Sequence, residues 1–488
     1  MMTGIFTSRA RFLVGICIIA AIASGWWILQ TKSKQKSVSV VIYLVDTLRA
    51  DRLGTYGYSK RATSPEIDDI ARNSVVFEEA YAPAPWTLPS VASLITSTFL
   101  CEHQIFSGRQ RLNASFDTLP ELLQEAGYFT GGAYSNLWVG PGHGLAGGYE
   151  NFIFTGGDDQ RHAPEVLDLL QQAGDSPFYF YLHTMEPHDA HATLPEYIQQ
   201  FGHVSVGDRL AYKQTHERYI ALKEADWEAH QALGTTDNTA LQLEAISFFR
   251  RHDEDLNLLY DASVRRADDN LGEVIDLLKE TGAWDSTIFV FLSDHGEEIG
   301  EHGGWFHDQS VYEELIHVPL IIHFPGDEFG GRRILGPVSL IDVMPTIFDY
   351  LGRPELCGKC RGRSLMKKLI EENPSTDDRS GVLSIRYNVR TFFEPMKSER
   401  GNVNVAIRQG SLKGIWNAEV ETVELYDLSA DPREQKNLGA ERRESSSEIA
   451  RLASAWLQSC AQNARLPEGP AQLNEESRAQ LRSMGYLD

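Results

Sequence analysis

Thr87 is a hydroxyl residue at a place in the sequence where it could act as a nucleophile. It stands two residues before Pro89, at the start of an apolar-periodic run that predicts a short helix. Proline fits the first turn of a helix, where its missing N–H is not needed. Thr87 would then lie just before a helix N-terminus, where free N–H groups and the helix dipole favour a bound anion. A threonine here can also be an ordinary helix cap, so its function depends on its neighbours.

Polar residues follow three predicted strands at the point where each strand ends. The strands are predicted at residues 38–45, 178–182 and 288–292, and the residues that follow are Asp46, His183, Asp294 and His295. In open parallel sheets, ligands bind outside the carboxyl ends of the strands. Two carboxylates and an imidazole predict a site for one divalent cation, held by Asp46, Asp294 and His295. Oxygen ligands suit Ca²⁺ or Mg²⁺, whereas the imidazole is better accepted by Mn²⁺ or Zn²⁺.

Two histidine-rich segments, residues 183–191 and 294–307, follow two of these strands. A histidine can protonate a leaving oxygen or activate water near neutral pH. We assign this general-acid function to His188 or His307. Such clusters can also bind a metal ion without catalysis.

The sequence pattern predicts an α/β fold with a mainly parallel sheet and helices on both faces. A helix is predicted to open at residue 65, and an amphipathic helix is predicted over residues 260–279. Residues 195–257 are charged and helix-like, and we interpret them as a helical insertion near the site.

The pattern changes near residue 380, where short strands follow one another closely. Strands at residues 381–385, 403–407, 414–416 and 422–426 predict a small antiparallel sheet, followed by a helix over 442–459 and a polar tail with a last short helix. We therefore divide the chain into residues 1–37, 38–378 and 379–488: an N-terminal anchor and linker, a catalytic domain, and a C-terminal subdomain with its tail.

The composition restricts the classes of partner. The 488-residue chain has a formal net charge of −23, which argues against nucleic acid as a ligand. An anionic substrate would need a local positive field, so a cation or a basic cluster should lie at the site.

Residues 12–29 form a nearly unbroken apolar run, with Arg9 and Arg11 before it and three lysines soon after it. The run just reaches the length of a membrane span. We favour an uncleaved signal anchor that holds the catalytic domain outside the cytoplasm, in the periplasm or the extracellular space. The alternative is a signal peptide cleaved after Ala21-Ile22-Ala23, which would release a secreted protein.

Five cysteines are present, and Cys17 lies in the apolar run. Cys357 and Cys360 form a CxxC motif, which in an oxidising compartment predicts a small local disulfide. On the pattern alone, Cys101 and Cys460 could be free thiols.

Several motifs resemble the sulfatase family, within the alkaline phosphatase superfamily. They lie at residues 46–57, 86–90, 187–188, 293–297, 300–303, 312–322, 424–432 and 437–438. The resemblance implies an alkaline-phosphatase-like sandwich with a large mixed, mainly parallel sheet flanked by helices, and a small C-terminal α+β subdomain with a short antiparallel sheet.

The resemblance also implies roles for individual residues. Asp46, Asp294 and His295 match metal positions, with Ca²⁺ as the family's metal, and Thr87 matches the nucleophile, which also touches the metal. His188 matches a substrate-contacting histidine, and His307 falls near a family lysine that contacts the anion. We assign further substrate contacts to His183, His302 and Asn136.

The chain departs from the family pattern at the nucleophile. Thr87 and Val91 stand where sulfatases have a cysteine or serine followed four residues later by arginine, so formylglycine is not expected. Thr47 replaces the second aspartate of the metal pair, and residues 134–138 replace a lysine–tryptophan–histidine segment. A threonine nucleophile resembles the membrane-anchored phosphoglycerol and phosphoethanolamine transferases of the superfamily.

We therefore expect a metal-dependent hydrolase of a sulfate or phosphate ester that acts through a covalent threonyl intermediate. The substrate would be a sulfated or phosphorylated glycan, lipid or small molecule. The alternatives are a membrane-anchored phosphoryl-group transferase and an inactive homologue that binds an anionic glycan.

Overall fold

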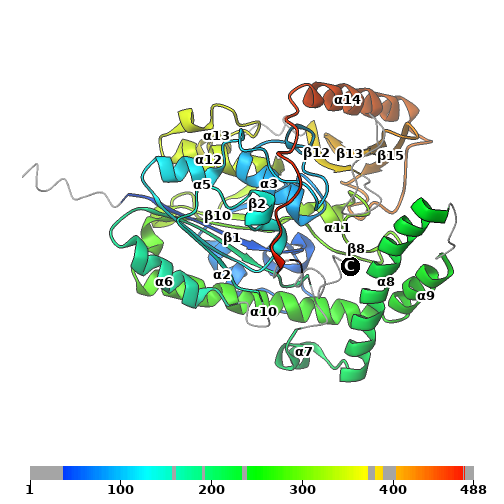
Figure 1. Ribbon diagram of the computed structural model, residues 1–488, viewed down its shortest axis with the longest axis horizontal. Coiled ribbons are helices and arrows are strands. Elements are labelled where there is room, and N and C mark those ends of the chain that lie inside the picture. The colour runs from blue at the N-terminus through cyan, green and yellow to red at the C-terminus, as the bar shows by residue number, and fades with distance from the viewer. Residues whose placement is uncertain are drawn as a thin grey trace, which may run out of the picture. The chain divides into compact units, whose positions relative to one another are not determined.

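The computed structural model describes residues 37–156, 161–188, 193–233, 239–371, 380–387, 403–475 and 478 (Figure 1). The described residues from Ser39 onward form one compact unit. In the described part of the chain, no helix is both long enough and apolar enough to span a membrane. The predicted anchor at residues 12–29 and the last helix of the tail lie outside the described residues.

The main sheet has nine strands in the described residues, in the order β11-β2-β10-β6-β1-β5-β3-β4, with β9 also paired to β2. The strands are β1 (Ser39–Val45), β2 (Val75–Tyr81), β3 (Phe129–Tyr134), β4 (Asn151–Phe154), β5 (Phe178–Thr184), β6 (Thr287–Leu292), β9 (His317–Val318), β10 (Leu320–His323) and β11 (Arg333–Ser339). β1 pairs in parallel with both β5 and β6, whereas β10 is antiparallel to β6 and β2. The sheet is therefore mixed and mainly parallel, as predicted.

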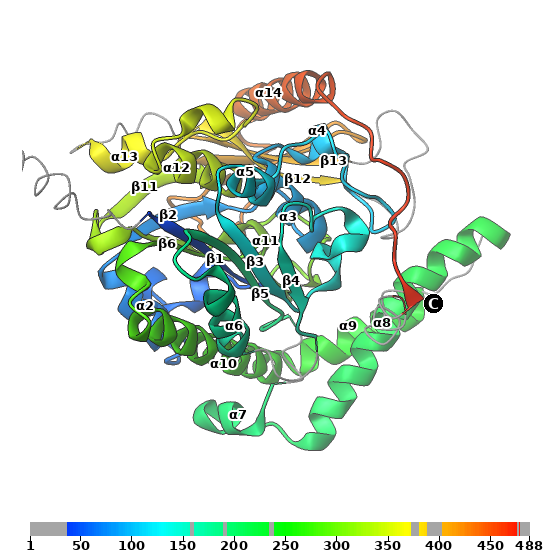
Figure 2. The same cartoon turned by 60° about the vertical axis from the view of Figure 1, so that its left-hand side comes forward.

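Helices cover both faces of this sheet (Figures 1 and 2). One face carries α2 (Pro65–Arg72), α6 (Ala163–Ala173) and α10 (Asp253–Glu280), and the other carries α3 (Thr87–Thr96), α5 (Leu119–Glu125) and α12 (Val343–Tyr350). The amphipathic pattern at 260–279 corresponds to α10. Its apolar side chains, among them Val264, Leu271 and Val274, are fully buried against the sheet. Its first turn is acidic, with Asp253, Glu254 and Asp255, and lies in the segment interpreted as a helical insertion.

The segment predicted as a helical insertion is helical in the structure. It contains α7 (Pro195–Phe201), α8 (Val206–Leu233) and α9 (Thr239–Arg251), and it leads directly into α10. Shorter elements complete the unit: α4 (Leu100–His103), α11 (Glu313–Ile316), α13 (Met366–Ile370) and a two-stranded sheet of β7 (Glu298–Ile299) and β8 (Trp305–Phe306).

The C-terminal part contains the predicted antiparallel sheet, in the order β12 (Ser380–Tyr387), β13 (Val403–Gln409), β14 (Leu412–Asn417) and β15 (Thr422–Asp427). Helix α14 (Arg443–Ala461) packs across it. Gly414 permits this close approach, because a Cβ there would lie 2.4 Å from a methyl carbon of Ile449. The fold class is thus confirmed, and the domain limits at residues 37/38 and 378/379 stay predictions.

Two disulfides tie the described chain together. Cys357–Cys360 confirms the predicted local bridge. The interpretation of Cys101 and Cys460 as possible free thiols is wrong, because they form a disulfide between α4 and α14. Their pairing depends on tertiary packing across 359 residues, which no local pattern reports.

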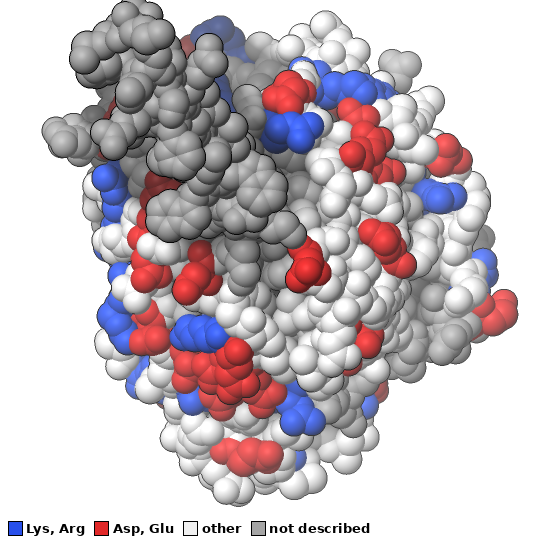
Figure 3. Space-filling model, turned by 90° about the vertical axis from the view of Figure 1, so that its left-hand side faces the viewer, with Lys and Arg blue, Asp and Glu red and all other residues white. Residues whose placement is uncertain are grey.

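Charged side chains of both signs are intermingled on the face of the molecule drawn in Figure 3. Acidic side chains also gather there in one larger cluster, so on this face the excess of negative charge is unevenly distributed.

Candidate active site

The three central strands bring the predicted polar residues to one edge of the sheet. Asp46 directly follows β1, His183 is near the end of β5, and Asp294 and His295 come just after β6. The parallel register places Leu44 beside both His183 and Leu292, so these strand ends lie level with one another. All four side chains are fully buried.

Thr87 lies against this group. It is the first residue of α3, and its hydroxyl oxygen Oγ1 is 3.3 Å from Nε2 of His295. The hydroxyl of Ser90, one turn further along α3, donates a 2.7 Å hydrogen bond to the carbonyl oxygen of Asp294. This bond fixes the N-terminus of α3 against the loop that carries Asp294. The helix begins at Thr87 itself, one residue earlier than the sequence indicated.

Two buried carboxylate oxygens in the group accept no hydrogen bond from the described residues: Oδ1 of Asp46 and Oδ2 of Asp294. Nε2 of His295 lies 3.6 Å from the first and 3.5 Å from the second. Nδ1 of His295 is 2.9 Å from the carbonyl oxygen of Gly296. Since that contact takes the ring proton, the Nε2 lone pair faces the carboxylates.

This donor set fits a divalent cation. Ligand atoms of Asp46, Asp294 and His295 all lie within 4.8 Å of one another. Buried oxygens without partners are costly unless a cation or donor compensates them. Thr47, which stands where sulfatases have a second aspartate, adds a further buried oxygen, Oγ1, without a hydrogen bond among the described residues.

The pKa shifts of Asp46, Asp294 and His295 also indicate a bound cation. Burial raises the pKa of Asp294, and the neighbouring charge of Asp46 raises it further. Burial would also raise the pKa of Asp46, but the hydrogen bond from His183 and nearby histidines lower it overall. Burial lowers the pKa of His295 to about 4, so this imidazole is neutral. Two adjacent buried carboxylates are held ionised together most readily by a cation between them.

His183 and Asn136 hold Asp46 in place. Nε2 of His183 is 3.2 Å from Oδ2 of Asp46, and Nδ1 of His183 is 2.9 Å from the hydroxyl of Tyr181. The amide of Asn136 donates to the same Asp46 oxygen at 2.6 Å and to the Thr87 hydroxyl at 3.3 Å. Both residues were predicted to contact substrate. In the structure they are buried and contact the cluster, so they can orient its members, and their contact with substrate stays a prediction.

His188 and His307 lie on one side of this cluster. The ring centroid of His307 is 4.7 Å from that of His295, and the centroid of His188 is 4.9 Å from that of His307. Nδ1 of His307 is 3.3 Å from a carboxylate oxygen of Glu297, which can orient the ring. The structure therefore brings both predicted general acids to the Thr87 region.

His302 has a different environment. Its Nδ1 is 2.5 Å from Oε1 of Glu314, its Nε2 is 3.1 Å from the carbonyl oxygen of Glu434, and its ring stacks on Tyr312 at 3.7 Å. These contacts join the loop after β6 to the C-terminal part of the chain. They give no support to the predicted substrate contact.

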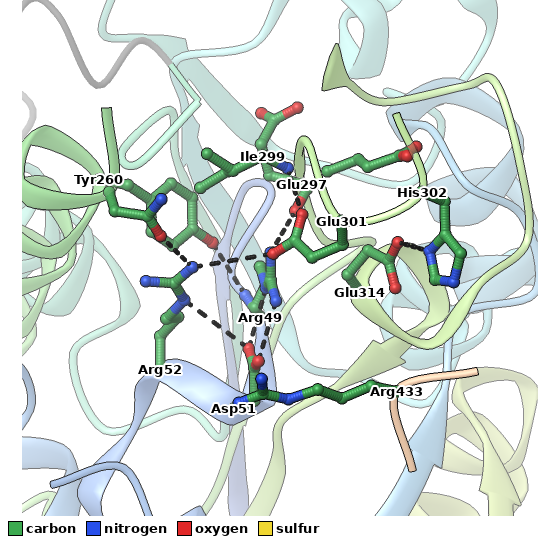
Figure 4. Close-up of polar contacts among 12 residues, drawn as sticks. Arg49, Asp51, Arg52, Tyr260, Glu297, Ile299, Glu301, His302, Glu314 and Arg433 are labelled. Atoms are coloured by element: carbon green, nitrogen blue, oxygen red, sulfur yellow. Dashed lines mark hydrogen bonds and ion pairs between the residues drawn. The ribbon is translucent and has the colours of Figure 1, made fainter. Parts of the chain in front are cut away.

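Arg49, for which the sequence pattern predicts no function, connects the two loops that carry the carboxylates (Figure 4). Its Nη1 donates to the carbonyl oxygen of Glu297 at 3.0 Å and to Glu301 at 2.5 Å. The hydroxyl of Tyr260 donates to the carbonyl oxygen of Thr47 at 2.6 Å and accepts from the backbone N–H of Arg49 at 3.0 Å. The motif at residues 46–57 indicated that this loop is functional. It did not indicate that the loop's partners are Tyr260, Glu297 and Glu301, more than 200 residues away.

A buried hydroxyl at a helix N-terminus lies beside two buried carboxylates and an imidazole at the carboxyl edge of a mixed sheet, an arrangement that a metal-dependent ester hydrolase could use. Comparisons with known proteins agree. The sequence model of the family described as Sulfatase matches residues 39–353, and the model described as N-sulphoglucosamine sulphohydrolase, C-terminal, matches residues 300–460.

Individual relatives are distant, and they cover different shares of the chain. An N-acetylglucosamine-6-O-sulfatase of Bacteroides thetaiotaomicron is 24% identical over 474 residues, covering 83% of each chain. A multifunctional alkaline phosphatase superfamily protein of Trinickia caryophylli is 34% identical over 189 residues, covering 37% of this chain and 36% of that one. The phosphonate monoester hydrolase of Agrobacterium radiobacter has the same fold, with a TM-score of 0.64 at 19% identity, covering 90% of this chain and 100% of that one.

The chain belongs to the sulfatase family, whose members are sulfuric ester hydrolases.

Proposed function

We propose that this protein is a metal-dependent hydrolase of a sulfate or phosphate ester and that Thr87 is its nucleophile. One observation carries the proposal. The Thr87 hydroxyl lies 3.3 Å from a neutral imidazole nitrogen that also faces two buried carboxylate oxygens without hydrogen bonds among the described residues.

Asp46, Asp294 and His295 would hold the cation, and Thr87 would add its hydroxyl oxygen. When bound, a divalent ion would lower the pKa of the Thr87 hydroxyl and offset negative charge on the ester oxygens. The family resemblance favours Ca²⁺, and the donor set also suits Mg²⁺, Mn²⁺ or Zn²⁺.

The residues of the chain then divide the reaction between them. Oγ1 of Thr87 gives its proton to solvent and attacks the sulfur or phosphorus atom, and the bond from that atom to the alcohol oxygen breaks. His188 or His307 gives its proton to the departing oxygen. Backbone N–H groups at the N-terminus of α3 face the remaining oxygens. Water then attacks the threonyl ester, Oγ1 leaves and takes back a proton, and the inorganic anion is released.

Whether the substrate is a sulfate ester or a phosphate ester depends in part on the chemistry of an unmodified Thr87. The relatives named above include a sulfatase, which favours a sulfate ester. An unmodified hydroxyl is a common nucleophile in phosphoryl transfer, whereas formylglycine is what makes a covalent sulfate ester easy to hydrolyse. Both classes of ester are therefore candidates, and release to a second alcohol in place of water would give the transferase alternative.

Export of the catalytic part is a further proposal. The two disulfides support it, because such bridges persist in oxidising compartments. The membrane anchor at residues 12–29 stays a prediction.

The test is the Thr87→Ala variant of the purified protein, assayed with aryl sulfate, phosphate monoester and phosphodiester under each of the four cations. We expect kcat to fall at least roughly a thousandfold. Thr96→Ala is the matched control, since Thr96 lies on the same helix and bonds only within its own segment. Mass spectrometry of the peptide that contains Thr87 should then show a trapped sulfate or phosphate adduct.

The outcomes separate the alternatives. Activity that survives in Thr87→Ala removes this residue from the mechanism. A parent protein that turns over none of the esters under any cation supports the anion-binding homologue.

A further inference from the structure

An aromatic pocket opens beside the candidate active site. We define the aromatic pocket by the side chains of its walls, which are Tyr212, Phe249, Leu256, Tyr260, Trp305 and Phe306. Its walls come from α8 and α9 of the helical insertion, from the start of α10 and from β8, which Figure 1 shows close together. The insertion thus contributes to a pocket that the catalytic elements alone would not form.

Contacts among its walls hold the aromatic pocket in shape. The ring of Phe249 packs against Trp305 and Phe306, with centroid distances of 5.5 and 5.2 Å. His216, one turn after Tyr212 on α8, stacks on Phe306 at 4.0 Å. The hydroxyl of Tyr212 donates to Asp255 at 3.0 Å. A pocket that is already formed requires little ordering when a ligand binds.

Two features indicate that the pocket wall is shaped for a ligand. Phe306 has φ of 73°, a left-handed conformation that a bulky side chain rarely adopts and that costs free energy. Trp305 is 3% exposed, and its indole N–H has no acceptor among the described residues.

The aromatic pocket is continuous with the reacting centre. His188 lines it, and from His188 the rings of His307 and His295 lead to Thr87 at the distances given above. In the proposed mechanism His188 or His307 protonates the departing oxygen. A pocket that begins at His188 therefore lies on the side of the departing alcohol.

The charge of the lining restricts what can bind. Glu297 and Glu298 line the pocket, and none of the described residues that line it is a lysine or arginine. A second sulfate group on the alcohol would meet carboxylates and aromatic faces instead of a cation. An uncharged apolar group would bury its surface favourably against the same walls.

We propose that the aromatic pocket binds an apolar, preferably aromatic, group of the alcohol part of the ester. The substrate class is then the monoesters of aryl-bearing or similarly apolar alcohols, and multiply sulfated sugars are poor substrates. The inference rests on the proposed function, because it places this group relative to Thr87 and His188.

The test compares esters whose alcohols have similar acidity, so that leaving-group chemistry does not confound binding. We expect kcat/KM for 2-(2-naphthyl)ethyl sulfate to exceed that for ethyl sulfate at least roughly tenfold. The same pair of phosphate esters replaces them if the parent prefers phosphorus. Glucosamine-2-N,6-O-disulfate and choline sulfate are the anionic and cationic comparisons.

Leu256→Glu changes the pocket with little risk to the core, because Leu256 is only partly buried. We expect this variant to bring the naphthylethyl-to-ethyl ratio of kcat/KM close to one. Leu210→Glu is the matched control: Leu210 is 53% exposed on α8 and does not line the pocket, so the ratio should stay at the parental value. Phe306→Ala gives a second pocket variant if Leu256→Glu fails to fold.

The proposal is overturned if the parental ratio is near one, if Leu256→Glu and Phe306→Ala leave it unchanged, or if the disulfated sugar or choline sulfate is the best substrate. Failure of the proposed function is seen separately, as a parent that hydrolyses no ester. In that case binding of 2-(2-naphthyl)ethanol, followed by tryptophan fluorescence, decides the pocket. Binding that Leu256→Glu abolishes and Leu210→Glu retains supports it, and absence of binding to the parent overturns it.

Discussion

Asn136 is the residue whose side chain joins the proposed nucleophile, Thr87, to the proposed cation site. Its amide nitrogen contacts both Asp46 and Thr87, and its amide oxygen accepts the backbone N–H of Trp138 at 2.9 Å. The last bond fixes the orientation of the amide, so that its nitrogen faces the carboxylate. Asn136 therefore sets the position of two groups that must act together.

We predict that Asn136→Ala lowers both cation affinity and kcat/KM by about 10- to 100-fold, because Asp46 and Thr87 lose their shared donor. The measurements are a calorimetric titration with Ca²⁺ and steady-state kinetics on the preferred ester. Asn417→Ala removes an asparagine of the C-terminal sheet and should change neither value. Parental cation affinity in Asn136→Ala would contradict the assignment.

Asp294 gives a second prediction at this scale, because its carboxylate is unfavourable without a cation and needed with one. In the presence of a chelator, Asp294→Asn should raise the unfolding free energy by about 1–3 kcal/mol, since the amide removes the repulsion from Asp46. Under saturating Ca²⁺ the same variant should be less stable than the parent, because the parent alone gains from binding. Thermal unfolding with and without the ion measures both. If Asp294→Asn is more stable than the parent in both conditions, or less stable in both, a cation at this cluster is ruled out.

At the scale of elements, the disulfide Cys101–Cys460 ties α14 to α4, which follows α3, the helix that begins at Thr87. A bridge between distant residues restricts the unfolded chain far more than a bridge between close ones. We predict that the double variant Cys101→Ser and Cys460→Ser lowers the free energy of unfolding by about 2–5 kcal/mol.

The matched control for this bridge is the pair Cys357→Ser and Cys360→Ser, which opens a loop across a separation of only 3 residues. Its effect on denaturant unfolding should be much the smaller of the two. Equal effects of the two double variants would mean that the long sequence separation of Cys101 and Cys460 adds nothing to the free energy of unfolding.

The elements also show how far the sequence predicts this structure. β1 and β6 are buried on both faces, so their sequences are continuous apolar runs that end at Asp46 and just before Asp294. The parallel arrangement then places those residues together, which is why the cation site could be predicted.

The partners of the other predicted residues could not be read from the sequence, for one physical reason. His302 lies in a glycine-rich loop beside the metal motif, yet its partners are Glu314 and the backbone of Glu434. His183 was placed correctly at a strand end, but burial against Tyr181 directs it to Asp46. Local periodicity reports which residues share a face, whereas these partners are set by the route of loops in three dimensions.

At the scale of the whole molecule, a chain with a net charge of −23 must still attract an anion. A cation at Asp46, Asp294 and His295 supplies one positive centre. Arg386, from the C-terminal sheet, is buried, and its side chain contacts the backbone of Asp308, next to His307. The C-terminal part thus brings a positive charge toward the residues proposed for acid catalysis.

The contacts between the C-terminal part and the loop after β6 also predict how stability depends on pH. Burial would lower the pKa of His302, but its bond to Glu314 and the nearby Glu434 raise it to about 9. A histidine whose pKa is higher in the folded protein stabilises it fully below the unfolded value, about 6.5. This stability is lost as the pH rises through about 9. We expect the parent to lose about 1 kcal/mol more than His302→Gln between pH 7 and pH 9.5, because solvent partly screens the pair. Denaturant unfolding at both pH values, with Ca²⁺ saturating so that the cation site does not contribute, measures the difference. His203→Gln, at an exposed position, is the control and should lose as much unfolding free energy between the two pH values as the parent. If His302→Gln also loses as much as the parent, the charge of His302 does not connect the two parts of the chain.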